Sequence, residues 1–167
     1  MTKYAALTLA LVLAAPAPAL AEESVKTYSN VQWGFSASFP YTIKESPGEN
    51  GGITISAANP EDTIAYMLSV FPIADEVLKL KKQDKILEDA VKGAVDNVKG
   101  TLLSKSDIKI DGFPGKQFDI KSDQFVAKCR IYLVGKRMYL PMVIAAPELR
   151  LPLTSEAFHA SFKLTKK

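Results

Sequence analysis

The sequence predicts an α+β fold made mainly of strands, with one long helix near its middle and a short helix at its C-terminal end. Apolar and polar residues alternate with a period of two over most of the chain, which is typical of half-buried strands. The alternation gives way to a helical spacing between residues 84 and 99. No internal repeat and no low-complexity linker interrupts the pattern, so we expect a single domain.

Residues 1–21 predict a cleavable signal peptide. Lys3 supplies a positive charge, an uncharged apolar run follows, and small residues precede the predicted cut. The apolar run is shorter than the roughly 20 residues that a membrane anchor needs, and two prolines follow it. We therefore expect cleavage between Ala21 and Glu22, a periplasmic or secreted location, and a mature domain at residues 22–167.

Composition excludes several classes of protein. The single cysteine, Cys129, cannot close an internal disulfide, so the core must depend on packing. The 21 basic and 18 acidic residues are interspersed, and no basic stripe typical of nucleic-acid binding is present. No hydrophobic segment after the signal peptide is long enough to span a membrane. We expect a monomer that binds no nucleic acid.

The N-terminal half predicts strands separated by tight turns. Phe35, Ala37 and Phe39 point to one face of the first strand, and Pro40 ends it. Glycine and proline clusters separate the strands that follow. The predicted strands lie at Val25–Pro40, at Thr42–Glu45 as a short edge piece, from Ile53 to Asn59, and at Thr63–Phe71.

The long helix is predicted by a single apolar stripe. Asp84 is the expected N-cap, and Gly100 suits the left-handed residue after the helix. Gly93 lowers helix stability by about 1 kcal/mol relative to alanine, and we expect close packing to explain it. The stripe consists of Ile86, Leu87, Ala90, Val91, Ala94, Val95 and Val98.

The C-terminal half returns to the period of strands. Gly135 and Lys136 form the expected hairpin turn, and the strand after it is apolar on both faces, which predicts a central position. A final helix is expected to begin at Thr154 or Ser155. The predicted strands are Ser104–Ile110, Lys116–Lys121, Phe125–Val134 and Arg137–Ala146.

Several of these segments resemble motifs of the PsbP/Mog1-like domain family. Residues 110–118 are similar to its glycine-proline-glycine turn, and residues 130–139 to the hairpin after that turn. Residues 34–40 resemble an early strand of the family, and residues 161–164 the end of its last helix. Pro141 departs from the pattern and predicts an edge or a bulge at that point.

The resemblance implies an α/β/α sandwich, with a mainly antiparallel sheet and helices on both faces. The family includes extrinsic photosystem II subunits, Ran-binding nuclear proteins and exported bacterial proteins of unknown role. Known members mostly bind other proteins, which implies a binding role here. No residue of this chain matches a metal site of the photosystem subunits.

No pattern in the chain predicts catalysis, a cofactor or a metal. His159 is expected to be exposed and lacks evident partners, and Cys129 is expected to face the core with a raised pKa and no reactivity. Residues 34–38 lack the second glycine and the helix of a nucleophile elbow. Four aspartates on neighbouring strands have lysines nearby, which favours cross-strand pairs over calcium binding: Asp107, Asp111, Asp119 and Asp123.

One group of residues predicts a binding surface. Arginine and tyrosine, which dominate protein interfaces, gather on one face of the hairpin, while Trp33 and Tyr41 flank the first strand. The alternative is that a helix covers this face and the basic side chains pack along it. The candidate binding residues are Lys128, Arg130, Tyr132, Arg137 and Tyr139.

We therefore expect an exported, non-enzymatic protein that binds or stabilises a protein partner in the cell envelope. The alternative is a carrier of a small ligand or lipid, with a pocket between sheet and helix lined by Met67, Met138 and Met142. A partner-binding protein should show a closed core and an exposed aromatic and basic patch. A carrier should show a large apolar pocket, and an enzyme a cleft with strongly perturbed titratable groups.

Overall fold

The structure, a computed structural model, describes residues 25–165. The predicted signal peptide and its cleavage site between Ala21 and Glu22 lie outside the described residues. The strands are β1 (Lys26–Asn30), β2 (Phe35–Phe39), β3 (Lys44–Pro47), β4 (Ile53–Ala58), β5 (Ile64–Pro72), β6 (Thr101–Ile110), β7 (Phe113–Lys121), β8 (Val126–Val134), β9 (Arg137–Ala145) and β10 (Lys163–Leu164). The helices are α1 (Asp75–Leu80), α2 (Gln83–Asn97) and α3 (Thr154–Ser161), with a short 3-10 turn, η1 (Glu49–Gly51).

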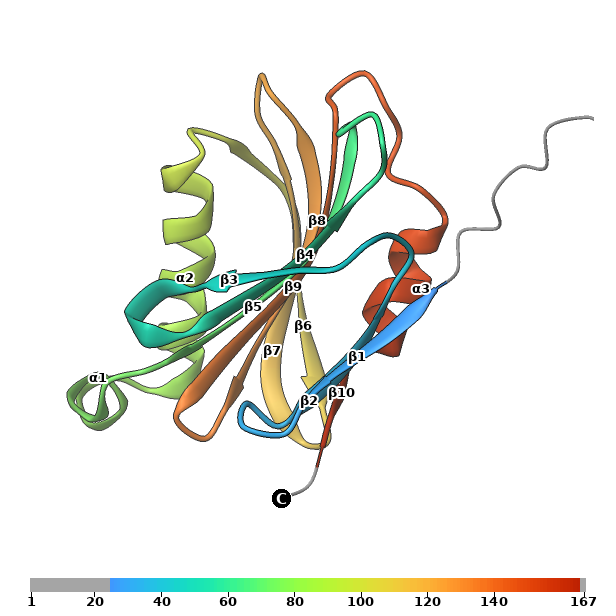
Figure 1. Cartoon of the computed structure of the whole chain (residues 1–167). Coiled ribbons are helices and arrows are strands. Elements are labelled where there is room, and N and C mark those ends of the chain that lie inside the picture. Colours follow the sequence, from blue (N-terminus) through green and yellow to red (C-terminus); the bar gives the residue numbers. More distant parts are fainter. Residues whose placement is uncertain (1–24, 166–167) are drawn as a thin grey trace, which may run out of the picture.

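A seven-stranded antiparallel sheet is the centre of the fold, with the strand order β3-β4-β5-β9-β8-β7-β6. The long helix α2 covers one face of this sheet, and α3 lies on the other face together with the small sheet β1-β2-β10 (Figure 1). The α+β fold and the helices on both faces, which the sequence and the family resemblance predicted, are confirmed.

Alternate residues of the central strands supply two cores. On the α3 side, Leu68 and Val70 of β5 pack with Phe39 of β2. On the α2 side, Cys129 and Leu133 of β8 pack against the apolar stripe of α2. Because the strands are buried on both faces, the sheet is shared by both cores.

The segment predicted as one strand at Val25–Pro40 is a hairpin. The backbone N–H of Trp33 donates to the Asn30 side-chain oxygen at 2.9 Å, and the N–H of Gly34 donates to the Asn30 carbonyl at 2.8 Å. Gly34 has a φ of +71°, which favours glycine. These contacts reverse the chain between β1 and β2, so the period-two pattern continues across a turn.

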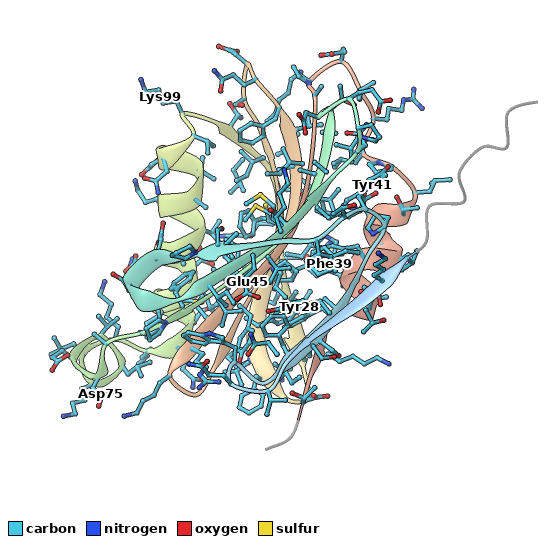
Figure 2. The ribbon with its side chains drawn as sticks, viewed as in Figure 1. Tyr28, Phe39, Tyr41, Glu45, Asp75 and Lys99 are labelled. Atoms are coloured by element: carbon cyan, nitrogen blue, oxygen red, sulfur yellow. The ribbon has the colours of Figure 1, made fainter. Side chains whose placement is uncertain are left out.

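The small sheet also contacts the main sheet through its side chains. Figure 2 shows Tyr28 of β1 beside Glu45 of β3, and the Tyr28 hydroxyl donates a hydrogen bond to that carboxylate. Burial and the Glu45 bond raise the pKa of Tyr28. Phe39 points toward α3, where its ring lies 5.2 Å from that of Phe158.

The ends of α2 differ from the prediction. The helix begins at Gln83, so Asp84 lies in its first turn rather than at the N-cap, and its carboxylate instead bonds the Lys116 ammonium at 2.6 Å. Lys99, with a φ of +49°, takes the left-handed position that was predicted for Gly100. A methyl group at Gly93 would meet no atom within 4 Å, so close packing does not explain this glycine.

Two further features were not predicted correctly. Helix α1 spans only six residues, too few to show an apolar stripe. Strand β9 is central, as its apolar character predicted, but Pro141 forms neither an edge nor a bulge. Instead, the β8–β9 pairing breaks off after Cys129–Met142 and resumes in the same register at Tyr132–Tyr139, because proline lacks a ladder donor.

Candidate interaction surface

Three turns and the C-terminal strand meet at one end of the sheet, the lower end in Figure 1. They surround an open recess of about 510 Å³, which we call the turn-end recess. Its lining includes Gly34 at the end of the β1–β2 turn, Asp111 in the β6–β7 turn, Lys136 in the β8–β9 turn and Thr165 after β10. Residues far apart in the sequence therefore form one surface.

Arg137 is held at this recess by Trp33. Its guanidinium carbon lies 5.0 Å from the centroid of the Trp33 ring, a cation–π arrangement. The Tyr139 hydroxyl donates a 2.7 Å hydrogen bond to the Trp33 carbonyl and so fixes the turn that carries the indole. Within residues 25–165, no carboxylate lies at ion-pair distance from Arg137. Its guanidinium donors are therefore available to an external anion.

Exposed apolar side chains line the recess or lie in the turn next to it. Phe113 lines the recess and is 38% exposed, and Val31 in the neighbouring β1–β2 turn is 83% exposed. Lys136 also lines the recess, and its ammonium lies 2.8 Å from Asp75 of α1. A planar cation beside exposed apolar side chains can bind a carboxylate bidentately while an apolar group packs next to it.

Lys128 and Arg130, two of the predicted binding residues, contact α3. Both lie on the α3 face of β8 and pair with Glu156 of that helix, at 2.7 Å and 2.9 Å. The hydrogen bond from Lys128 lowers the pKa of the Glu156 carboxyl. The helix-covered arrangement, considered above as the alternative to a free surface, is therefore found at these two residues.

Tyr132 and Tyr139 are buried, with 4% and 3% exposure. The Tyr132 ring stacks on Phe162 at 5.8 Å, and Tyr139 lies 5.7 Å from the same ring. Both rings belong to the α3-side core and offer no free aromatic face. Of the five predicted residues, Arg137 is the one with a charged group at an open recess and without an internal ion pair in the described structure.

Sequence reasoning missed the pairing of Trp33 with Arg137 and the position of Phe113. These residues lie in or beside three different turns, so only the tertiary fold brings them together. The sole tryptophan in a turn was the one available sequence feature.

A second open space, the α2 groove, lies between helix α2 and the main sheet and has a volume of about 600 Å³. Phe71, Leu140 and Met142 contribute to its floor, and Ala90 and Gly93 to its helical wall. The groove is open because these helical residues are small. Of the three methionines predicted to line such a pocket, Met142 does so, whereas Met138 is buried in the α2-side core.

His159 is buried, at 3% exposure, which contradicts the exposed position expected for it. Its ring lies beside the backbone of Lys128 but makes no hydrogen bond of normal geometry within the described residues. Burial, followed by the charge of Arg130, lowers the pKa of His159 to about 4. The imidazole is therefore neutral near pH 7 and lies away from the turn-end recess.

Cys129 is packed in a core, and Lys116 is held by ion pairs. Cys129 faces the α2-side core as predicted, and burial raises its pKa to about 12. Lys116 is bound by Asp107 at 2.6 Å, by Asp84 at 2.6 Å and by Glu88 at 3.0 Å. These bonds raise the pKa of Lys116, and the bond with Asp107 has the largest effect.

No three potential metal ligands gather in residues 25–165, and no helix there has the length and apolar character of a membrane span.

No protein-family model and no curated protein sequence matches this chain. Its structure is similar to the solution structure of cyanobacterial PsbP (CyanoP) from Synechocystis sp., with a TM-score of 0.61 and 11% identity. That match covers 90% of this chain and 98% of the other.

Two crystal structures align with a TM-score of 0.45. One is a protein of unknown function from Pseudomonas aeruginosa, at 13% identity, covering 81% of this chain and 92% of that one. The other is a protein from Bacteroides thetaiotaomicron, at 17% identity, covering 85% of this chain and 49% of that one. The similarity to cyanobacterial PsbP shows that the chain has the PsbP-like fold, as its turn and hairpin motifs predicted.

Proposed function

We propose that the protein is an exported, non-enzymatic binding protein whose partner, a protein of the cell envelope, docks on the turn-end recess. The observation that carries this proposal is Arg137, a guanidinium stacked on Trp33 and without an internal carboxylate in the described structure. Arginine and tryptophan are the residue types that most often dominate binding energy at protein interfaces.

The recess also suggests the chemistry of the partner. An aspartate, a glutamate or a terminal carboxylate would accept two hydrogen bonds from Arg137, and an apolar neighbour would pack on Phe113. Asp111, which lines the same recess, disfavours a partner with two adjacent acids. The proposed partner segment is therefore one acid beside an apolar residue.

Cross-linking in the native envelope tests the proposal. A photoreactive residue placed at Gln32, an exposed position next to Trp33, should form one discrete protein adduct. Trp33→Ala and Arg137→Ala should each remove the adduct. Arg150→Ala, a matched loss of an exposed arginine outside the recess, should leave it unchanged. Equal adduct yields from Arg137→Ala and Arg150→Ala would contradict the proposal.

The α2 groove supports a second candidate, a carrier of an apolar ligand. Its floor is largely apolar and its volume of about 600 Å³ lies in the range of small-molecule sites. Native mass spectrometry of protein purified from the envelope distinguishes the two proposals. A bound lipid that Gly93→Leu displaces, with no adduct at Gln32, would favour the carrier.

A further inference from the structure

Strand β6 is a long open edge of the main sheet. It spans ten residues and, within residues 25–165, pairs only with β7. Thr101 to Asp107 are all exposed, as is Lys109. The opposite edge, β3, has only four residues. An exposed edge of this length can accept another strand unless its side chains oppose it.

The β6–β7 turn determines which backbone groups face outward. Asp111 and Gly112 both have positive φ, at 48° and 84°, as in a two-residue type I′ turn. Ile110 and Phe113 are then the hydrogen-bonded pair that closes the hairpin. Toward the N-terminal end of β6, the backbone groups of every second residue from Ile110 therefore bond β7, at Ile110, Ile108 and Ser106. The residues between them point their backbone donors and acceptors outward: Lys105, Asp107 and Lys109.

The charges on these outward residues alternate in sign. Lys105 pairs with Glu88 and Asp107 with Lys116, so both side chains lie on the α2 side of β6. The charged residues on this side are, in order, Lys105, Asp107 and Lys109, and Asp111 follows in the turn. An alternating row of this kind is complementary to its own reverse. In an antiparallel pair centred on Ile108, Asp107 of one copy faces Lys109 of the other, and Lys105 faces Asp111.

We propose that β6 pairs with β6 of a second copy of this chain, antiparallel and centred on Ile108. The pair joins two seven-stranded sheets across a two-fold axis, an isologous interface. On the α3 face, Ile108 then lies opposite its own symmetry mate and adds an apolar contact. This dimer replaces the monomer expected from the sequence, and it does not depend on the proposed partner at the turn-end recess.

The same charges oppose neighbouring registers. A pair centred on Asp107 would place Asp107 against itself and Lys105 against Lys109, both like-charged. A pair centred on Ser106 would keep the contact of Lys105 with Asp107 but place Lys109 opposite Leu103, at the irregularity in β6. The charge pattern therefore favours the register centred on Ile108 over its neighbours, and it disfavours nonspecific pairing at this edge.

A single engineered cysteine tests this register. Ile108 bonds β7 through its backbone, so the central Ile108 pair is not hydrogen-bonded, and its Cβ atoms lie within disulfide reach. Ile108→Cys should form a covalent dimer under mild oxidation. Ser106→Cys, whose mate in this register is Ile110, should stay uncross-linked. The wild-type chain is the control for Cys129, which is buried. Preferential cross-linking at Ser106 would overturn the proposal.

Charge reversal tests the interface without a covalent bond. The wild-type chain should show the mass of a dimer in light scattering after size exclusion. Lys109→Asp should halve that mass, because it places two carboxylates opposite each other. Lys109→Arg should keep the dimer, because it keeps the opposite charges of the pair with Asp107. Lys26→Asp, on the exposed edge strand β1, is the matched control and should remain a dimer. A monomeric wild-type chain at the highest soluble concentration would overturn the proposal.

Discussion

The buried imidazole of His159 makes the stability of the fold depend on pH. It faces Arg130 and Lys128 of β8, with Glu156 on its own helix, and burial lowers its pKa from 6.5 to about 4. Between these values the unfolded chain binds a proton that the folded chain does not. The contribution of neutral His159 is therefore complete above pH 6.5 and is lost as the pH falls toward 4.

Urea unfolding at several pH values measures this effect. For the wild-type chain, we expect the free energy of unfolding to fall by about 3 kcal/mol between pH 6.5 and 4, from the size of the pKa shift. His159→Leu should remove most of this slope above pH 5. The lowered pKa values of Glu88 and Glu156 act mainly below their ordinary value of 4.5. An unchanged slope in His159→Leu would contradict the assignment.

The ion pairs of Lys116 contribute to the stability of the fold. Its ammonium is surrounded by Asp84, Glu88 and Asp107, and its side chain is 6% exposed. Lys116→Met keeps the stem but leaves the carboxylates without a shared cation. We expect a loss of about 1–2 kcal/mol in unfolding free energy, moderated because two of the carboxylates are well exposed.

Lys105→Met is the matched control for this variant. Lys105 pairs with Glu88, and its side chain is 35% exposed, so its removal should cost less than about 1 kcal/mol. Thermal unfolding at low and high salt compares the two variants. Lys116→Met should be the less stable at both, and a loss no larger than that of Lys105→Met would contradict a special role for Lys116.

Gly93 makes helix α2 less stable than alanine would at the same position. Gly93 lies inside the helix, and a methyl group there meets no atom within 4 Å. Gly93→Ala should therefore stabilise the protein by about 0.5–1 kcal/mol. Gly100→Ala is the contrast, because its Cβ would lie 2.6 Å from Ile120. Chemical denaturation should give opposite signs for the two changes.

The elements also show what sequence patterns can predict. Helix α2 was predicted because its apolar residues recur with the helical period. The β8–β9 hairpin was predicted because a two-residue turn separates two segments typical of strands. Strand β10 has only two residues and pairs with β2, more than a hundred positions earlier, so no local pattern indicates it. Short α1 was missed for the same lack of a repeat.

The candidate site was only partly predictable for a similar reason. Arg137 was selected because arginine is common at interfaces, and it lies at the turn-end recess. Tyr139 was selected for its residue type, but its exposure depends on Phe162, which covers its ring from a distant part of the chain. Burial of Tyr132 and the stacking of Trp33 on Arg137 likewise arise only from the tertiary fold.

The two cores of the protein share one sheet. Phe39 anchors the α3-side core and Leu133 the α2-side core, and both are fully buried. The strands β8 and β9 send alternate residues into each core. Loss of packing on one face therefore loosens strands that support the other, and we expect both cores to unfold in a single transition.

Two core substitutions test this coupling. Phe39→Ala and Leu133→Ala should each lower the unfolding free energy by about 3–5 kcal/mol through cavity formation. In both variants, Trp33 fluorescence, which reports the turn end, and far-ultraviolet circular dichroism, which reports the sheet and α2, should have the same midpoint in denaturant. If Phe39→Ala shifted the fluorescence midpoint alone, the two layers would unfold independently, and the shared strands would not couple them.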